Sequence, residues 1–508
     1  MKTAVLADLH LTDDFGTVKT QVLNWALAAA ERSGAELLCC IGDLTAQGSD
    51  RQTAEVLRRL TRCAIPCCST PGNAELRLFP GGRNAVRFDL PPPAGIPIVM
   101  IDTAAGEPPQ RELAKLEALP DRGGFLLATH NPTANWSENA RRIFRDALRR
   151  GAVTAVIAGH SHHDAEGILR GLDPDKASGG PPMVAILEQL PDRGWKRSDL
   201  VMPGVDPSQW EERERSEFRR NLGVSTMGKS AEALDFAARN RIENVELRPP
   251  VEACPETEAA IREWRGRGGR ILSLHLPDLD PRNDGSELRA HVALAHRLGC
   301  DRVTLHVPRI TAARFAEAEA MLLERFGREL RILLENKVTV GIENLHTRRG
   351  ETAFETRNFG CTIEECRGWI LKLRERFGTD RIGFHLDVGH ARNNAPISQR
   401  ENLSDWYAGL GELLNGWHLH QVKPEAGAFL NHHPLTGFYD KLISLGGMFL
   451  ALNSGQLPRQ APMFLESREW EGNVKAYAAL TELLARSGIP REKRTDPIEG
   501  ICPVENHR

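Results

Sequence analysis

Seven side chains in the first third of the chain are of the types that bind divalent metals. They are Asp8, His10, Asp43, Asn73, His130, His160 and His162. Carboxylates, an amide carbonyl and several imidazoles together form the ligand mixture that holds two transition metals about 3.5–4 Å apart. The residue types therefore predict a dinuclear metal site in the N-terminal part of the chain.

A second and longer set of metal-binding residue types lies in the C-terminal half. It comprises His275, His306, Glu343, Asp387, His390, His418, His420, His433 and Glu466. Each follows a short apolar run, at or just past the expected end of a strand. A lone histidine on a strand is more often a core residue than a ligand. Repetition at successive strand ends instead favours a second metal site.

The elements that must position the first set alternate along residues 1–190. Apolar runs such as TAVLAD, ELLCCIGD, GGFLLATH and AVTAVIAGH each end in a polar residue, and helical patterns follow at residues 22–32 and 53–62. Strands that end in polar residues and lead into helices are typical of an α/β layered sheet with its site at the strand ends. We expect one α/β domain over residues 1–190.

A second alternation covers residues 222–490 and contains eight strand-like runs separated by amphipathic helices. This is the number of strands that a (β/α)8 barrel needs, and barrel enzymes place their chemistry at the carboxyl ends of the strands. Residues 191–221 include a Pro/Gly segment and the charged run EERERSEFRR, so we expect a linker with a connecting helix. Residues 491–508 are expected to form a tail.

Length and composition agree with two globular domains. The chain has 508 residues, 41% hydrophobic and 26% charged, whereas a single core stops growing at roughly 250–300 residues. A net charge of -3 gives no general basic field, so a nucleic-acid substrate is not favoured, although a local basic groove would be hidden in this total.

The chain start and the cysteines indicate a cytoplasmic protein without a membrane partner. MKTAVLADLH lacks the layout of a signal peptide, and no run of about 18 apolar residues follows. The ten cysteines lack the spacing of a disulfide framework. Cys63, Cys67 and Cys68 could bind a metal, but small core residues are the favoured interpretation.

The motifs D-x-H, G-D, G-N, H and G-H-x-H of residues 1–190 resemble the calcineurin-like metallophosphoesterase family. The resemblance implies that Asp8, His10, Asp43 and His162 hold one metal and that Asp43, Asn73, His130 and His160 hold the other, with Asp43 bridging. It also implies two divalent metals (Mn, Fe or Zn) that polarise a phosphate and activate a water for in-line attack. Asp43 and Asn73 are the residues assigned to catalysis in this domain.

One position departs from the family pattern. The motif G-N-H-D/E reads Gly72-Asn73-Ala74-Glu75 here, so Ala74 replaces the histidine that is expected to protonate the leaving group. The loss of a general acid typically lowers the rate by about 10²–10⁴-fold. Three readings stay open: specialisation for esters with good leaving groups, a degenerate or regulatory domain, or an engineered change. A specialised working site is favoured because every metal ligand is present.

The C-terminal part resembles the endonuclease IV and xylose-isomerase-like superfamily of sugar isomerases and epimerases, over residues 222–488. The specific motifs are E-N at Glu343, D-x-G-H at Asp387, H-x-H at His418 and L-E-S ending at Ser467. The resemblance implies a metal held by Glu343, Asp387, His418 and Glu466. Glu343 and Glu466 would then move a proton at the carbon next to a carbonyl.

Endonuclease IV holds three zinc ions with further ligands, and the matching positions here are His275, His306, His390, Asn431 and His433. Asn431 stands where an aspartate is expected, which removes one negative charge from the site. The resemblance therefore implies one to three divalent metals (Zn, Mn or Fe) in the barrel.

Residues 223–230 match the P-loop pattern G-x-x-x-x-G-K-S, but they coincide with the first expected barrel strand and its helix. A chance match is therefore favoured, with Lys229 at the start of a surface helix.

The sequence is compatible with two enzymatic functions and with a sensor or scaffold role for the N-terminal domain. The favoured one joins a phosphoesterase for a small phosphorylated metabolite to a sugar or sugar phosphate isomerase or epimerase, with Arg309, Arg348, Arg349 and Arg392 as candidate anion-binding residues. The alternative is DNA repair, with cleavage at abasic sites and end processing.

Overall fold

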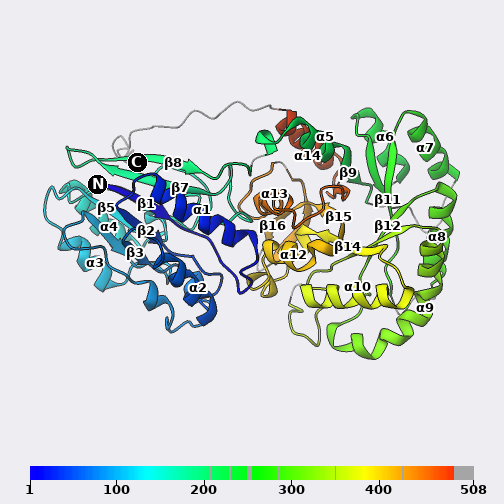
Figure 1. Ribbon diagram of the computed structural model, residues 1–508, viewed down its shortest axis with the longest axis horizontal. Helices are drawn as coiled ribbons and strands as arrows, with labels where there is room; N and C mark the ends of the chain where they lie inside the picture. The colour runs from blue at the N-terminus through cyan, green and yellow to red at the C-terminus, as the bar shows by residue number, and fades with distance from the viewer. Residues whose placement is uncertain are drawn as a thin grey trace. The chain divides into compact units, whose positions relative to one another are not determined.

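The computed structural model describes residues 1–205, 207–227, 230–248, 255–280, 282, 285–348, 350–425, 428–435 and 437–485. They divide into two units. The first unit comprises Met1–Pro203 and Tyr439–Gly447, and the second comprises Gly204–Phe438 with the described residues from Met448 onward. In Figure 1 the chain of the first unit starts in blue, and the barrel strands of the second unit run from green to brown.

The first unit contains two sheets. Its strands are β1 (Lys2–Leu6), β2 (Leu37–Ile41), β3 (Cys67–Thr70), β4 (Ile98–Ile101), β5 (Phe125–Thr129), β6 (Val153–Ala158), β7 (Met183–Gln189) and β8 (Trp195–Val201). One sheet has the order β3-β2-β1-β7-β8 and the other β4-β5-β6. Strands β1, β2 and β3 are parallel to one another, as are β4, β5 and β6, whereas β7 is antiparallel to both β1 and β8.

The two sheets of the first unit share one apolar core. Val5 and Ile41 of the larger sheet pack with Leu126 and Ile157 of the smaller sheet. The opposite face of the smaller sheet is covered by two helices, α3 (Gln110–Glu117) and α4 (Glu138–Arg149), through residues such as Phe144. Two further helices, α1 (Val18–Arg32) and α2 (Asp50–Leu60), complete the unit. The expected α/β sandwich is confirmed.

The sandwich extends beyond the expected boundary at residue 190. Residues 195–201, which we assigned to a linker, form the edge strand β8, and the first unit ends its main segment at Pro203. Five of the seven residues of β8 are only partly buried, so polar side chains are tolerated there. Its sequence therefore resembles that of a loop. A solvent-facing edge strand needs no continuous apolar run.

The first unit also includes Tyr439–Gly447, which the sequence assigned to the barrel. Ser444 N–H donates to the carbonyl of Asp175 (2.9 Å), and Gly447 N–H donates to that of Pro174 (3.0 Å). The first unit is therefore discontinuous in sequence.

The second unit contains a closed barrel of parallel strands in the order β10-β11-β12-β13-β14-β15-β18-β9. The strands are β9 (Leu222–Ser225), β10 (Asn244–Leu247), β11 (Arg270–His275), β12 (Arg302–His306), β13 (Thr339–Glu343), β14 (Ile382–Asp387), β15 (Leu414–Leu419) and β18 (Met463–Leu465). All eight expected barrel strands are present, and the TIM barrel is confirmed.

Helices follow most barrel strands and precede the first. They are α5 (Glu212–Asn221), α6 (Ser230–Arg239), α7 (Pro255–Gly266), α8 (Ser286–Leu298), α9 (Phe315–Glu335), α10 (Ile363–Phe377), α11 (Val388–Arg392), α12 (Leu403–Leu410), α13 (Gly446–Asn453) and α14 (Trp470–Ala485). Local signals set their ends: α10 starts after Thr362, whose side chain accepts from Glu365 N–H, and ends at Gly378 with a φ of 60°.

One addition to the barrel pattern was not expected. A hairpin of β16 (Gln421–Glu425) and β17 (Ala428–His433) follows β15.

Some positions singled out in the sequence lie outside the described residues. Gly223 of the P-loop pattern lies within β9, but Gly228 and Lys229 are outside the described residues. The same is true of Arg349 and of the expected tail at 491–508. Within the part of the chain that the structure describes, no helix is both long and apolar enough to span a bilayer.

The three cysteines that were considered as a metal site have different neighbours. Cys68 lies in the apolar core of the first unit, Cys67 faces Cys40 with a distance of 3.9 Å between the sulfurs, and Cys63 contacts Glu31.

A buried ion pair anchors α1 of the first unit. Lys19 and Asp173 both have no exposed side-chain surface, and Lys19 Nζ lies 2.9 Å from Asp173 Oδ1 and 3.6 Å from Asp175 Oδ2. Lys19 Nζ also donates to the carbonyl of His10 (3.3 Å). A charge in this position is stable only while its partners are present.

We expect Lys19→Met to destabilise the first unit by about 3 kcal/mol, because the variant leaves the carboxylates of Asp173 and Asp175 buried without their main counter-ion. Hydrogen exchange of β1 and α1 peptides in the full chain measures this change. The matched control is Lys115→Met, which removes a half-exposed ion pair with Glu112 and should cost less than about 1 kcal/mol. Equal exchange in the two variants would contradict the prediction.

Candidate metal centres

The first cluster of ligand atoms in the first unit joins Asp8, His10 and His162. These residues follow β1 and β6, and their ligand atoms lie within 4.8 Å of one another. The Nε2 atoms of His10 and His162 are 3.2 Å apart. Two nitrogens that are each about 2.1 Å from one metal, at angles of 90–110°, are separated by roughly 3.0–3.4 Å, so the distance fits a shared cation.

The second cluster joins Asp43, Asn73, His130 and His160. His130 Nε2 lies 3.1 Å from Asn73 Oδ1, and His160 Nδ1 lies 2.9 Å from the same oxygen. The facing nitrogens of His130 and His160 are 3.3 Å apart. These separations again fit ligands of one metal. All seven N-terminal residues that the sequence singled out therefore lie in these two clusters.

Asp43 connects the two clusters. Its Oδ1 lies 3.4 Å from His130 Nε2, and its Oδ2 lies 3.7 Å from His10 Nε2. The N–H of Ala74 donates to Oδ1 at 2.7 Å and helps to orient the carboxylate. The two oxygens of Asp43 thus face different clusters, as a bridging ligand requires.

The loops that carry these ligands have unusual backbone conformations. Asp8, His10, Asp43, His160 and His162 all have φ between 49° and 70°, a region that residues other than glycine seldom adopt. A Cβ at Gly42, which has a φ of 86°, would lie 2.5 Å from the N atom of Gly72 and 2.9 Å from His130 Nδ1. Packing therefore imposes a strained conformation that turns the ligands toward one point.

Glu75 supports the loop of the bridging residue. Its side chain is fully buried, and it accepts four hydrogen bonds: from the N–H groups of Asp43, Thr45 and Gly72 and from the hydroxyl of Thr45. The motif G-N-A-E therefore keeps its structural glutamate.

Concentrated negative charge marks the centre of this site. Burial, and then the nearby Asp43, raise the pKa of Asp8 to about 8, although His130 acts in the opposite direction. Burial lowers the pKa of His162 to about 3, which keeps its imidazole neutral and able to bind a metal. A divalent cation would balance the two carboxylates.

Ala74 is fully buried. Its methyl group is therefore enclosed by surrounding residues.

In the barrel, four predicted ligands converge on one point. His418 Nδ1 lies 3.1 Å from Glu343 Oε1, 3.3 Å from Glu466 Oε2 and 3.9 Å from Asp387 Oδ2. Strand register explains this, because Asp387 pairs with His418 across β14 and β15. Four atoms here are buried and have no hydrogen-bond partner among the described residues: His418 Nδ1, Glu343 Oε1 and both Glu466 carboxylate oxygens. This donor set fits a divalent metal.

A second ligand group shares Glu343. His275 Nε2 lies 3.0 Å from Glu343 Oε2, and His306 Nε2 lies 3.4 Å from Glu343 Oε1. His306 and Glu343 are register partners on β12 and β13. His275, His306 and Glu343 can therefore hold a further metal beside the first.

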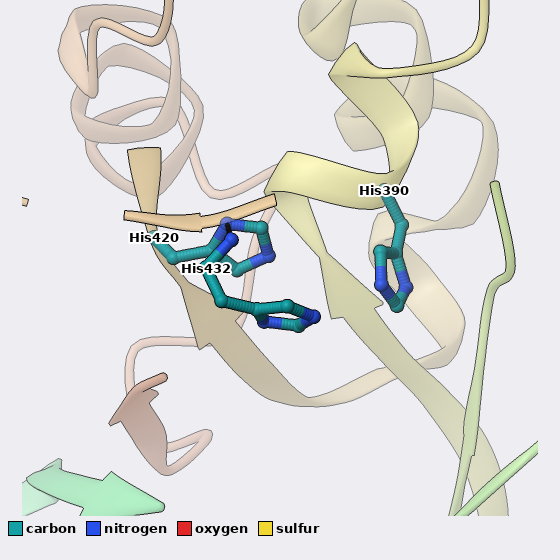
Figure 2. Close-up of side chains that lie close together, drawn as sticks. All are labelled: His390, His420 and His432. Carbon is teal, nitrogen blue, oxygen red and sulfur yellow. Dashed lines mark hydrogen bonds between the residues drawn. The ribbon is translucent and has the colours of Figure 1, made fainter. Parts of the chain in front are cut away.

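A third group consists of three histidines, His390, His420 and His432, whose ligand atoms lie within 4.8 Å of one another. Figure 2 shows their rings gathered from α11, the end of β15 and the hairpin strand β17. His420 Nε2 also lies 3.0 Å from Asp387 Oδ1, and His432 Nδ1 lies 3.4 Å from Glu466 Oε2.

The third group corrects the assignment of His433, whereas that of Asn431 stays a prediction. Asn431 Oδ1 accepts from the side chain of Asn393 (2.9 Å). Burial, and then Lys423 and Arg468, lower the pKa of the His433 imidazole, which lies near these cations. Neighbouring residues of a strand point to opposite faces, so only one of His432 and His433 can face the site. His432 takes this position with a φ of 62°.

Several charged residues that the sequence did not single out surround the barrel ligands. Asp278 Oδ1 lies 2.6 Å from His306 Nδ1, Glu246 Oε2 lies 2.6 Å from His418 Nε2, and Arg248 Nη1 lies 3.3 Å from Glu466 Oε1. No motif marks these positions, because each is an ordinary charged residue in or after a strand.

Three of the four expected anion-binding arginines lie within the described residues, and each has a protein partner. Arg309 forms an ion pair with Asp278, Arg348 lies 3.9 Å from Glu351, and Arg392 lies over the ring of Phe429.

Comparison with known families separates the same two parts. Residues 1–164 match the family described as calcineurin-like phosphoesterase, and residues 267–482 match the family described as xylose isomerase-like TIM barrel. A search of curated proteins finds no match.

Several solved structures are similar to about half of the chain. A xylose isomerase-like TIM barrel protein from Mycobacterium smegmatis in complex with magnesium has 13% identity and a TM-score of 0.39, over 52% of this chain and 96% of that one. A D-tagatose 3-epimerase-like protein has 18% identity and a TM-score of 0.37, over 52% and 97%. Endonuclease IV from Thermus thermophilus has 19% identity and a TM-score of 0.35, over 52% and 99%.

We expect Gly389→Ala to remove a cation from the three-histidine group without altering a ligand. A Cβ at Gly389 would lie 1.8 Å from His420 Cε1 and 2.4 Å from Nδ1, so the buried ring must move. Elemental analysis of the full chain should show about one metal fewer than in Gly368→Ala, a control in α10 where the added methyl meets open space. Equal metal content in the two variants would show that the group holds no cation.

Proposed function

Since the chain carries a calcineurin-like phosphoesterase domain followed by a xylose isomerase-like TIM barrel, we propose that it is a bifunctional metalloenzyme. The N-terminal domain hydrolyses a phosphate ester of a small metabolite, and the barrel isomerises or epimerises a sugar or sugar phosphate. The observation that carries the proposal is the convergence of complete ligand sets on Asp43 in one domain and on Glu343 in the other.

In the phosphoesterase domain, Asp8, His10 and His162 would hold one metal, Asn73, His130 and His160 the other, and Asp43 both. Two metals in these places polarise a phosphate and lower the pKa of an attacking water. The buried imidazoles of His10 and His162 stay neutral because burial lowers their pKa values. Both are therefore free to bind a metal at neutral pH.

The substrate of this site should have a good leaving group. The buried methyl of Ala74 offers no proton at the position where the family has its histidine. A leaving group of low basicity departs with little assistance from an acid. Activated monoesters and diesters therefore suit the site better than simple alkyl phosphates, and the complete ligand set supports a working domain over a regulatory one.

In the barrel, Glu343 and Glu466 each place a carboxylate oxygen within 3.3 Å of His418 Nδ1. Two carboxylates beside one metal suit the removal and return of a proton at the carbon next to a carbonyl. A metal there supplies Lewis-acid polarisation of that carbonyl. Arg248 is partly exposed at the end of β10 and would bind an anionic group of the substrate.

The second candidate function is cleavage of DNA at abasic sites. The three ligand groups of the barrel favour it, because they provide places for more than the one metal that an isomerase needs. The net charge of -3 disfavours a polyanionic substrate. Incubation of the protein with a duplex that contains one abasic site distinguishes the two functions: strand cleavage would replace the isomerase proposal.

We expect Asp43→Asn to abolish hydrolysis of a chromogenic phosphodiester and to lower the metal content by up to two ions, because the variant removes the shared ligand. Glu343→Gln should remove barrel metal and leave this hydrolysis intact. Metal content and hydrolysis are measured on the full-length protein. Undiminished hydrolysis in Asp43→Asn would refute the phosphoesterase proposal.

We expect Arg248→Met to raise the KM for a phosphorylated sugar about 10- to 100-fold, which is the value of a charge-assisted hydrogen bond. The KM for the corresponding unphosphorylated sugar should change less, because loss of the Arg248–Glu466 pair affects both sugars alike. Exchange of substrate hydrogen with deuterated water at the carbon next to the carbonyl measures turnover. Equal effects on both sugars would show that Arg248 does not recognise the phosphate.

A further inference from the structure

Glu246 makes a contact across the interior of the barrel that the proposed reaction does not use. It lies on β10, whereas its partner His418 lies on β15, and these two strands are not neighbours in the closed sheet. Both side chains have no exposed surface, and Glu246 Oε2 lies 2.6 Å from His418 Nε2. Water therefore has no access to this pair.

The two nitrogens of His418 have different surroundings. Nε2 faces the carboxylate of Glu246, whereas Nδ1 faces Glu343 and Glu466 and has no hydrogen-bond partner among the described residues. A neutral imidazole carries one N–H, and an ionised carboxylate can only accept. In a neutral His418 the hydrogen is therefore held on Nε2, which leaves the lone pair of Nδ1 for a metal beside Glu343 and Glu466.

We propose that Glu246 is a positioning residue, which fixes the tautomer and ring orientation of His418 so that Nδ1 binds the barrel metal. This inference rests on the proposed metal site of Glu343, Asp387, His418 and Glu466. A carboxylate behind a metal-binding histidine also makes the imidazole a stronger ligand, and the loss of such a partner typically weakens metal binding 10- to 100-fold.

His306 provides an internal comparison. Its Nδ1 lies 2.6 Å from Asp278, but the Asp278 side chain is 29% exposed and also pairs with Arg309. Water can replace a carboxylate in such an exposed place. Glu246 instead is fully buried and shares its cluster with His385, whose Nδ1 faces Arg302 and Thr304 at 3.3 Å. Bulk water therefore cannot replace Glu246 as it can replace Asp278.

The test measures Zn²⁺ affinity of the full-length protein by competition with a chromophoric chelator. Glu246→Gln keeps the size of the side chain and removes its charge, and we expect the dissociation constant of the barrel site to rise about 10- to 100-fold. Asp278→Asn, the matched control, should change the affinity of the His275 and His306 position by only a few-fold. The N-terminal metals should be unaffected in both variants.

A second variant and a spectroscopic readout separate positioning from a general loss of structure. Glu246→Asp keeps the charge but withdraws it from His418, so it should also weaken Zn²⁺ binding. Long-range ¹H–¹⁵N correlation spectra of histidine-labelled, Zn²⁺-loaded protein should show His418 as the Nε2–H tautomer in the wild type and a changed tautomer or exchange in Glu246→Gln.

Two outcomes would overturn the inference in different ways. Wild-type affinity in both Glu246 variants would refute the role of Glu246 and leave the barrel metal site standing. A wild-type barrel that binds no Zn²⁺ in the full chain would refute the proposed metal site and the inference with it.

Discussion

Both units of this protein keep clusters of carboxylates in their interiors. Asp8 and Asp43 are buried in the first unit, and Glu246, Glu343, Asp387 and Glu466 are buried in the second. An unpaired buried charge is costly, and a bound cation would compensate for the repulsion within such clusters. The surrounding strands and loops must therefore bring carboxylates and histidines to one point.

The two units satisfy the requirement by different means. In the first unit, ligands lie on loops after the strands, and their left-handed backbone conformations turn the side chains toward Asp43. In the barrel, ligands at adjacent strand ends are register partners, such as His306 and Glu343. Ordinary strand geometry therefore assembles the barrel pair, while the first unit depends on local strain that the surrounding packing maintains.

The sequence was most informative where a residue type and its position at a strand end agree. The convergence of the seven residues in the first unit and of the barrel set around His418 could be predicted in this way. His432 could not, because it adjoins His433 in a hairpin whose register decides which ring faces the site. Glu246 could not either, because a strand glutamate gains its role only from His418, 172 residues away in the sequence.

The segment Tyr439–Gly447 has a consequence for how the chain folds during synthesis. The first unit needs this segment, but the ribosome reaches it only after most of the barrel has been made. At about 5–20 residues per second, the roughly 240 residues after Pro203 take about 10–50 s to appear. During that interval the carbonyls of Pro174 and Asp175 lack the N–H donors of Gly447 and Ser444. The N-terminal domain is thus the first to be synthesised, but it gains the contacts of this segment only after most of the barrel has been made.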